Sequence, residues 1–404
     1  MTGTTIAQAI PIAISPILTR IYTPKDFGIF ALYISISSIF ATIATGRYEL
    51  AIMLPKKDED AINIVVLSII LSLVISLLTF IIVFFFNSQI TAILGNEEIK
   101  NWLYFIPLTV LLTGIYQAFN YWSNRKKQYR RLVSSKVIQS TTTATTNLSL
   151  GFSGLGSNGL IFGGILGQAI ATSVLIKMVL AKDKAKFKYT NKLKVFALAK
   201  KYKKLPFLSL PNALIDAIRV SGINILMTTF YSVTVLGQFS LAWKMIQVPM
   251  GIVGASLAQV FFQKVATTDS THLMHLTQNL ISKSILVAMP IFLIIYFFAT
   301  DIFIIVFGKE WVIAGEIASI LTPWLFLNFL TSPLGNIFIV LNKQEIVLGV
   351  SVLYMLLPLS ILWFFHNLDF LLVLKIITYT MSLILIAYIA LVFIYIKKEN
   401  KNDL

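Results

Sequence analysis

Long apolar runs separated by short polar segments dominate the sequence. Each run is close to the roughly 20 residues that an α-helix needs to cross a bilayer. Twelve runs can be marked, at residues 2–19, 27–45, 61–86, 102–119, 136–156, 159–180, 205–229, 233–256, 280–299, 315–341, 346–365 and 370–396. The pattern predicts an all-α polytopic membrane protein with about twelve transmembrane helices.

The composition supports this interpretation. Of the 404 residues, 57% are hydrophobic and only 12% are charged, with a mean hydropathy of +0.83. A soluble domain carries about a quarter charged residues, so a water-soluble globular protein is excluded. Cysteine is absent, so disulfides, thiolate metal sites and cysteine nucleophiles are excluded as well.

The net charge of +16 reflects topology rather than nucleic-acid binding. If the N-terminus is cytoplasmic, the cytoplasmic segments hold 26 of the 33 lysines and arginines. The opposite side then holds only Arg20, Lys25, Lys100 and Lys309. Cytoplasmic loops of membrane proteins carry just such an excess of positive charge. We therefore expect both termini to be cytoplasmic, and no nucleic-acid partner.

Two short matches indicate an internal repeat. Residues 22–32 (YTPKDFGIFAL) match 231–241 (YSVTVLGQFSL) at an offset of 209, and Leu94-Gly95 matches Phe307-Gly308 at an offset of 213. Six helices per repeat is an even number, so both halves insert in the same direction. This predicts two six-helix lobes related by a pseudo-two-fold axis along the membrane normal. It also predicts a first helix shortened at its N-terminus, since Leu205 maps to about four residues before Met1.

The predicted organisation has four parts. Residues 1–180 form an N-terminal lobe, 181–204 a basic amphipathic cytoplasmic linker, 205–396 a C-terminal lobe and 397–404 a cytoplasmic tail. In the linker, apolar residues alternate with lysines, as in helices that lie on an anionic membrane surface. The linker acts either as a tether that helps to set topology or as a binding site for lipid headgroups.

Charged residues inside the predicted spans are the main candidates for function. Each costs about 2.5–3.5 kcal/mol at a helix centre, so it normally faces a cavity or a partner. Asp216 and Arg219 lie three residues apart and share a helix face with Asn212, and Lys244 lies on the next span. The three charges sum to +1. One alternative is an Asp216 salt bridge that joins the two spans. The other, which we prefer, is a hydrated cationic cavity that accepts an anionic headgroup.

Two further arginines lie near the ends of predicted spans. Arg20 is at the outer end of the first span and Arg47 at the inner end of the second. At these depths a long side chain can reach the interface. Interfacial anchoring and contact with a substrate therefore both remain open for these residues.

The glycines of the fifth and sixth spans do not form a phosphate-binding loop. Residues 151–167 lack the Gly-Lys-Ser/Thr ending that such a loop needs. Gly159, Gly163 and Gly167 instead recur every four residues, which predicts close packing of two helices. We find no pattern for a catalytic, cofactor or metal site, so the expected cofactors are none beyond a coupling proton or sodium ion at Asp216.

Four segments resemble one family of transporters. They are PILTRIYTPKDFGIFALY (16–33), GRYELAIMLPKKDEDA (46–61), NYWSNRKKQYRRL (120–132) and FGKEWVIAGEI (307–317). They are similar to the bacterial oligosaccharide flippases, also called polysaccharide biosynthesis proteins or O-antigen translocases. This family belongs to the multidrug/oligosaccharidyl-lipid/polysaccharide (MOP) exporter superfamily.

The resemblance implies two helical bundles that form a MATE-like V around a central cavity in the bacterial inner membrane. It implies a non-enzymatic flippase that carries undecaprenyl-diphosphate-linked repeat units to the outer leaflet, for O-antigen, lipopolysaccharide or capsule. Polysaccharide polymerase and chain-length machinery are the implied partners, beside the lipid bilayer. Arg219, Lys244, Arg20 and Arg47 are the cationic residues that correspond to a diphosphate site.

Other functions remain open at this stage. A cation-coupled multidrug exporter of the same fold would favour an acidic cavity, whereas the intramembrane charge here is positive. A polysaccharide polymerase would need larger outer loops than 87–101 and 300–314. A structural partner of the glycan machinery is the third alternative.

Overall fold

The structure, a computed structural model, describes residues 2–265, 270–340 and 343–402. Within these ranges the chain is helical and contains no strand, which confirms the all-α prediction. It divides into two compact units, Met1–Gly237 and Gln238–Leu404.

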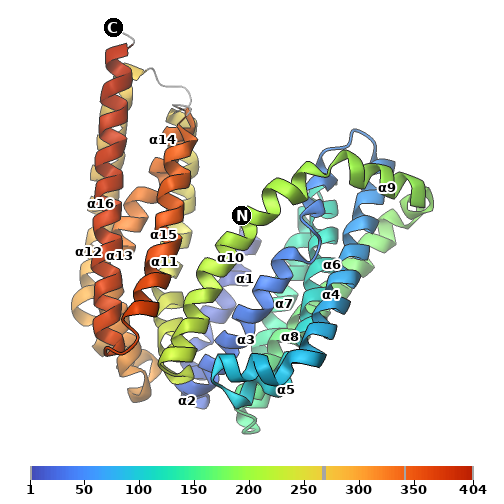
Figure 1. The fold of residues 1–404 in the computed structure, drawn as a ribbon, viewed down its shortest axis with the longest axis horizontal. Helices are drawn as coiled ribbons and strands as arrows, with labels where there is room; N and C mark the ends of the chain where they lie inside the picture. The colour runs from blue at the N-terminus through green and yellow to red at the C-terminus, as the bar shows by residue number, and fades with distance from the viewer. Residues whose placement is uncertain (1, 266–269, 341–342, 403–404) are drawn as a thin grey trace. The chain divides into compact units, whose positions relative to one another are not determined.

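The first unit contains ten α-helices and three 3₁₀ turns among the described residues, coloured blue to yellow-green in Figure 1. In chain order they are α1 (Thr2–Ala13), α2 (Ser15–Ile21), α3 (Pro24–Ile43), η1 (Tyr48–Met53), α4 (Asp58–Leu94), η2 (Glu97–Ile99), α5 (Lys100–Leu103), α6 (Ile106–Arg125), α7 (Tyr129–Phe152), α8 (Ser157–Asp183), η3 (Lys184–Tyr189), α9 (Lys192–Lys201) and α10 (Lys204–Phe230).

The second unit begins inside α11. Its elements are α11 (Val233–Val265), α12 (Ser270–Phe307), η4 (Lys309–Trp311), α13 (Val312–Thr331), η5 (Ser332–Leu334), α14 (Gly335–Val340), α15 (Gln344–Phe364) and α16 (Phe370–Asn402). The compact units thus divide after Gly237, whereas the sequence places the lobe boundary at residue 205. Helix α10 packs against α3 within the first unit, and the lobe boundary at residue 205 stays a prediction.

Eight helices in the described ranges are long and apolar enough to cross a membrane, or nine if the bent pair of residues 97–103 and 106–125 counts as one span. Together with the all-helical fold this makes the protein a multi-pass membrane protein. The count of twelve spans stays a prediction.

Helix α4 shows how lipid shapes the packing. Its buried face carries small polar side chains at Ser68, Ser72 and Ser76, and Ser76 donates a hydrogen bond to the carbonyl of Pro107 at 2.7 Å. Its exposed face carries large apolar residues, such as Phe84 and Phe85. Lipid is as apolar as leucine, so helices in membranes associate through small and hydrogen-bonding residues. The apolar face of α4 is therefore its lipid-facing surface.

Three of the predicted runs are broken rather than continuous. The first is interrupted at Ile14, before Pro16, and the fourth bends by 50° before Pro107. The tenth divides at Pro333 into α13, η5 and α14, and its last residue, 341, lies outside the described residues. Proline removes a backbone donor and clashes with the preceding turn, so it bends or ends a helix.

The predicted glycine packing in the fifth and sixth spans is confirmed. A Cβ atom on Gly163 would lie 1.8 Å from Oδ1 of Asn147, and one on Gly167 would lie 2.0 Å from Oγ1 of Thr143. A Cβ on Gly159 would lie 2.4 Å from the Tyr22 hydroxyl. Any larger residue would push α8 away from α7 and from the end of α2.

Both repeat matches have matching local structures. Thr23 caps α3 by accepting a hydrogen bond from the Asp26 amide, and Ser232, its counterpart at offset 209, accepts one from the Val235 amide before α11. In the second match, Gly95 and Gly308 end α4 and α12 with φ values of 64° and 109°, and a 3₁₀ turn follows each. Positive φ favours glycine, which explains why both positions carry it.

Candidate functional site

The candidate site is built on α10, which joins α3 through an antiparallel polar contact. The hydroxyls of Ser38 and Ser221 lie 2.8 Å apart, and the Asn224 amide donates to the Ser35 hydroxyl at 2.8 Å. These contacts hold α10 at a fixed register along α3. In lipid, each of these hydrogen bonds stabilises the helix pair more than van der Waals contact alone, so together they position the rest of α10.

Asp216 and Arg219 lie on another face of α10. Residues turn by about 100° per position in an α-helix, so Arg219 lies about 160° around the helix from Ser221. Its Nη2 lies 3.3 Å from Oδ1 of Asp216, and the two side chains are 33% and 73% exposed. Asn212, one turn before Asp216, is exposed as well. These three residues, Asn212, Asp216 and Arg219, form the α10 stripe, which therefore faces outward from the first unit.

This exposure has a cost in a membrane. Asp216 and Arg219 are in the middle of a 27-residue helix that is apolar enough to span a bilayer. Contact with acyl chains would leave both charges without the hydrogen bonds that water supplies. The arrangement therefore favours a hydrated surface beside α10 over contact with lipid.

Arg47 follows the end of α3 in an unusual backbone conformation. Its φ of 62° is in the left-handed region, which a residue with a Cβ rarely adopts. Its Nη1 lies 3.4 Å from Oε1 of Glu49, whose side chain is only 1% exposed. Thr45 donates a hydrogen bond to the same carboxylate. Glu49 thus holds Arg47 beside η1, which packs against α10.

The register of α3 and α10 relates Arg47 to the stripe. Ser38 lies opposite Ser221, and Ser35 lies opposite Asn224, so each step back along α3 is a step forward along α10. Extending this register places Arg47 at the height of Asn212. Arg219 is seven residues further along α10, about 10 Å at 1.5 Å per residue. Arg47 and Arg219 therefore lie at two successive heights along the axis of α10.

Arg20 is at the opposite end of α3 from Arg47. It lies in the last turn of α2, where its Nη1 donates to the carbonyl of Pro16 at 3.1 Å. The 20 residues of α3 separate the two arginines by about 30 Å. Arg20 is therefore not brought together with Arg47 and the α10 stripe.

Lys244 lies on α11 in the second unit, where its side chain is exposed. The charged partner recorded for Asp216 is Arg219, on its own helix. A salt bridge from Asp216 to the next span stays a prediction, as does a shared site of Arg219 and Lys244.

The sequence analysis missed a charged cluster at the start of α4. The carboxylate of Asp58 lies 3.1 Å from Nε of Arg125 and 2.8 Å from Nζ of Lys126, and it also pairs with Lys186. Lys186 belongs to the basic linker. The signal was present in the sequence: an acidic residue precedes the third span, and basic runs follow the fourth and the sixth.

A second missed pair is buried. Nη1 of Arg131 lies 2.8 Å from Oδ2 of Asp183, with side chains 7% and 8% exposed. The Trp122 indole donates to the same oxygen at 3.2 Å. These contacts join α6, α7 and α8 at the end where the linker begins.

The linker itself is docked on the first unit. The Tyr48 hydroxyl donates to the carbonyl of Ala199 at 2.9 Å, and burial raises the pKa of this phenol, so the hydroxyl keeps its proton. Leu198 is buried in the same core as Trp122, whereas Leu193 and Phe196 remain exposed. Some apolar residues of the linker therefore pack into the protein core, whereas others form an exposed apolar surface.

The comparisons with solved structures show the fold. An inward-facing multidrug resistance MATE family transporter of the MOP superfamily is 14% identical, with a TM-score of 0.74, covering 100% of this chain and 96% of that one. The lipid II flippase MurJ is 14% identical, with a TM-score of 0.78 and coverage of 98% and 87%. A MOP superfamily transporter from Pyrococcus furiosus is 15% identical, with a TM-score of 0.54 and coverage of 98% and 91%.

A comparison with curated protein sequences finds no match. The family described as polysaccharide biosynthesis protein matches residues 17–315, which include the first unit from residue 17 onward and with it the α10 stripe. With this match over most of its length and the MATE-like helical fold, the chain belongs to the polysaccharide biosynthesis protein family.

Proposed function

We propose that the protein is a flippase for undecaprenyl-diphosphate-linked oligosaccharide repeat units. It moves them from the cytoplasmic to the outer leaflet of the bacterial inner membrane, for surface polysaccharide such as O-antigen or capsule. The family assignment and the fold shared with a lipid II flippase support a transporter of this kind. The transported class is argued from the site itself.

The observation that carries the proposal is the exposed Arg219–Asp216 pair in the middle of a spanning helix. A guanidinium binds phosphate oxygens with two parallel hydrogen bonds and keeps its charge at any physiological pH. Arg47 adds a second cation along the same helix, and its own partner, Glu49, is buried behind it. The site therefore suits a diphosphate better than a cationic drug.

The mechanism we propose uses no covalent chemistry. The diphosphate replaces Asp216 as the partner of Arg219, while the polyprenyl chain stays in lipid. The glycan occupies the hydrated space beside α10. Alternating access of the two lobes then exposes the site to each side in turn. A released Asp216 carboxylate is the group that would take up a coupling proton or sodium ion.

The test is complementation of a strain that lacks the gene. Wild type and Arg219→Gln are expressed at matched membrane levels, and surface polysaccharide and the leaflet location of the lipid-linked repeat unit are measured. We expect Arg219→Gln to abolish surface polysaccharide and to leave complete repeat units on the cytoplasmic leaflet. Arg130→Gln, at an exposed arginine at the start of α7, is the matched control and should complement fully.

Three outcomes would contradict the proposal. Normal surface polysaccharide in the Arg219→Gln strain would show that the α10 stripe is not part of the substrate-binding site. Repeat units that reach the outer leaflet of the deletion strain without being polymerised would indicate a polymerase. Unchanged polysaccharide in the deletion strain together with increased drug sensitivity would indicate a multidrug exporter.

The topology has its own test. We propose that both termini are cytoplasmic, because the linker and the Asp58 cluster concentrate positive charge at one end of the first unit. Green fluorescent protein fused to the C-terminus should fluoresce, and alkaline phosphatase at the same place should be inactive. The reverse result would invert the proposed direction of transport.

A further inference from the structure

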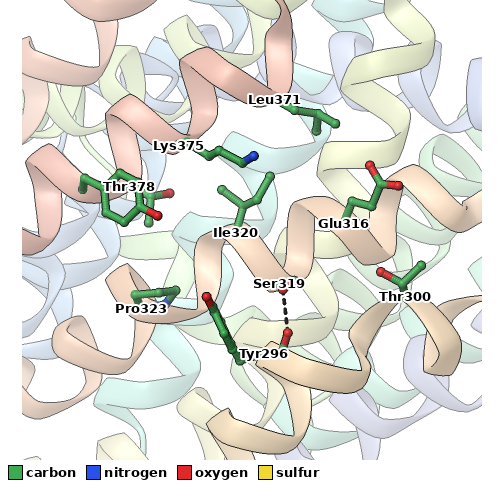
Figure 2. A pocket seen from close by; sticks show the side chains of 10 residues that line it. Tyr296, Thr300, Glu316, Ser319, Ile320, Pro323, Leu371, Lys375 and Thr378 are labelled. Carbon is green, nitrogen blue, oxygen red and sulfur yellow. Dashed lines mark hydrogen bonds between the residues drawn. The ribbon is translucent and has the colours of Figure 1, made fainter.

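A cavity of about 340 Å³ lies in the second unit, between α12, α13 and α16. This volume is within the range of roughly 300–1,000 Å³ that small-molecule sites occupy. Polar side chains from all three helices line it: Tyr296 from α12, Glu316 and Ser319 from α13, and Lys375, Thr378 and Tyr379 from α16 (Figure 2). The α10 stripe belongs to the first unit, and its residues are not among those that line this cavity.

The wall of the cavity contains a buried polar group that lacks a partner. Thr378 is 1% exposed, and its Oγ1 makes no hydrogen bond within the described ranges. A buried hydroxyl in a protein is normally hydrogen-bonded, so the Thr378 hydroxyl is free to pair with a polar group that enters the cavity. Ser319 is already engaged as a donor to the carbonyl of Tyr296 at 2.6 Å, and its oxygen can still accept.

Opposite charges lie on two sides of the same cavity. Lys375 and Glu316 approach it from α16 and α13, with Ile320 between them (Figure 2). Across the part of the chain that the structure describes, no salt bridge joins the two. A ligand with an anionic and a cationic group can satisfy both. A phosphate suits the lysine and the Thr378 hydroxyl, and a primary ammonium suits the carboxylate.

The depth of the cavity identifies the source of such a ligand. Glu316 is the fifth residue of α13 and Lys375 the sixth of α16, so each lies within about 8 Å of a helix end. Tyr296 and Tyr379 are exposed at the same site, as is typical of the aromatic belt at a membrane interface. Leu293 and Leu383 continue the exposed apolar surface along α12 and α16, on the side away from these helix ends. This is the level of phospholipid headgroups, with lipid-facing surface below it.

We propose that this cavity binds the headgroup of phosphatidylethanolamine. Lys375 and Thr378 bind the phosphate, Glu316 accepts hydrogen bonds from the ammonium, and the acyl chains lie along α12 and α16. Phosphatidylcholine lacks N–H donors for Glu316, and phosphatidylglycerol lacks a cation. The site holds a membrane lipid whatever cargo the protein transports, so the proposal stands independently of the flippase function.

The test is native mass spectrometry of the purified full chain in detergent. It is titrated with dioleoyl-phosphatidylethanolamine, dioleoyl-phosphatidylcholine or dioleoyl-phosphatidylglycerol, and the lipid-bound fraction gives the affinity. We expect phosphatidylethanolamine to bind about tenfold more tightly than the other two, since it alone pairs both charges. Lys375→Gln and Glu316→Gln should each remove this preference, and Thr378→Val, which keeps the shape of the side chain, should reduce it.

Matched controls separate binding from folding. Lys309→Gln changes an exposed lysine in η4 outside the cavity and should leave the preference intact. Lys375→Arg keeps the charge and should retain it. Equal affinities for the three lipids, or an unchanged preference in Lys375→Gln, would overturn the proposal. So would displacement of the bound lipid by water-soluble phosphoethanolamine at an equal concentration, because that would make the cavity a site for a free solute.

Discussion

Gly28 and Gly237 make the same contact from opposite sides. A Cβ atom on Gly28 would lie 1.7 Å from the carbonyl oxygen of Val233, and one on Gly237 would lie 1.8 Å from that of Pro24. Gly28 corresponds to Gly237 and Pro24 to Val233 at the same offset of 209. The first turns of α3 and α11 therefore pack about a local two-fold axis, with each glycine receiving the backbone of the other helix.

This contact predicts that neither glycine can be replaced. Gly28→Ala and Gly237→Ala should each lower the free energy of unfolding by about 1–3 kcal/mol or more, because a methyl group has to displace a backbone carbonyl. Thermal unfolding of the purified protein measures the loss. The control is Gly349→Ala on α15, where a Cβ meets no atom within 4 Å and alanine favours the helix. A loss at Gly349 as large as that at Gly28 would contradict the explanation.

The buried pair of Arg131 and Asp183 should be essential for stability. Asp183→Asn leaves the guanidinium without its counter-ion in a site from which water is excluded, at a cost of about 3–5 kcal/mol. Lys100→Gln, which breaks the exposed pair with Glu97, should change stability by less than about 0.5 kcal/mol. Denaturant or thermal unfolding compares the two, and equal effects would show that burial is not the deciding factor.

The Asp58 cluster should control the linker. Asp58→Asn removes the carboxylate that holds Lys186, so we expect trypsin to cleave residues 184–204 several times faster than in the wild type. Glu59→Gln, whose pair with Lys194 spans 3.7 Å between half-exposed side chains, should change the cleavage rate little. The rate is read from the appearance of two fragments on a gel. Slow cleavage in Asp58→Asn would mean that the core contacts of Leu198 hold the linker alone.

Arg47 combines backbone strain with a buried partner, and the two effects can be separated. Arg47→Gly relieves strain of about 1–3 kcal/mol but leaves the buried Glu49 carboxylate without its cation, which costs about 3–5 kcal/mol. We expect this variant to be less stable than the wild type. In Arg47→Gly with Glu49→Gln the buried charge is gone, so stability should recover to the wild-type value or above. A double variant weaker than either single variant would contradict this account.

The helices and their repeat could be predicted because lipid imposes a simple rule on sequence. A run of about 20 apolar residues has to be a helix in a bilayer, and Gly159, Gly163 and Gly167 have to face another helix. Thr23 and Ser232 could be paired because helix caps depend on local residues. The helix breaks at Ile14 and Pro333 were harder to predict, because proline in a membrane helix bends it in one context and ends it in another.

Part of the candidate site could be predicted because lipid also makes charged residues in a span easy to recognise. Charges in the middle of a span, such as Asp216 and Arg219, are conspicuous against an apolar background. Lys375 lies near the start of its span, where a long side chain can reach the interface, and Glu316 is far away in the sequence, so the sequence did not single out either residue. Arg131 and Asp183 lie at the ends of α7 and α8, next to strongly basic segments, so the sequence shows the charges but not which of them is buried.

Helix α3 places an arginine beyond each of its ends, about 30 Å apart, the thickness of the hydrocarbon core. If the cargo is a diphosphate, it meets a guanidinium group of the same chemistry at the level of either leaflet. Such a carrier has no direction of its own, because a balanced equilibrium runs both ways. Net export would then be driven from outside the protein, by enzymes that consume the repeat unit at one surface or by an ion gradient.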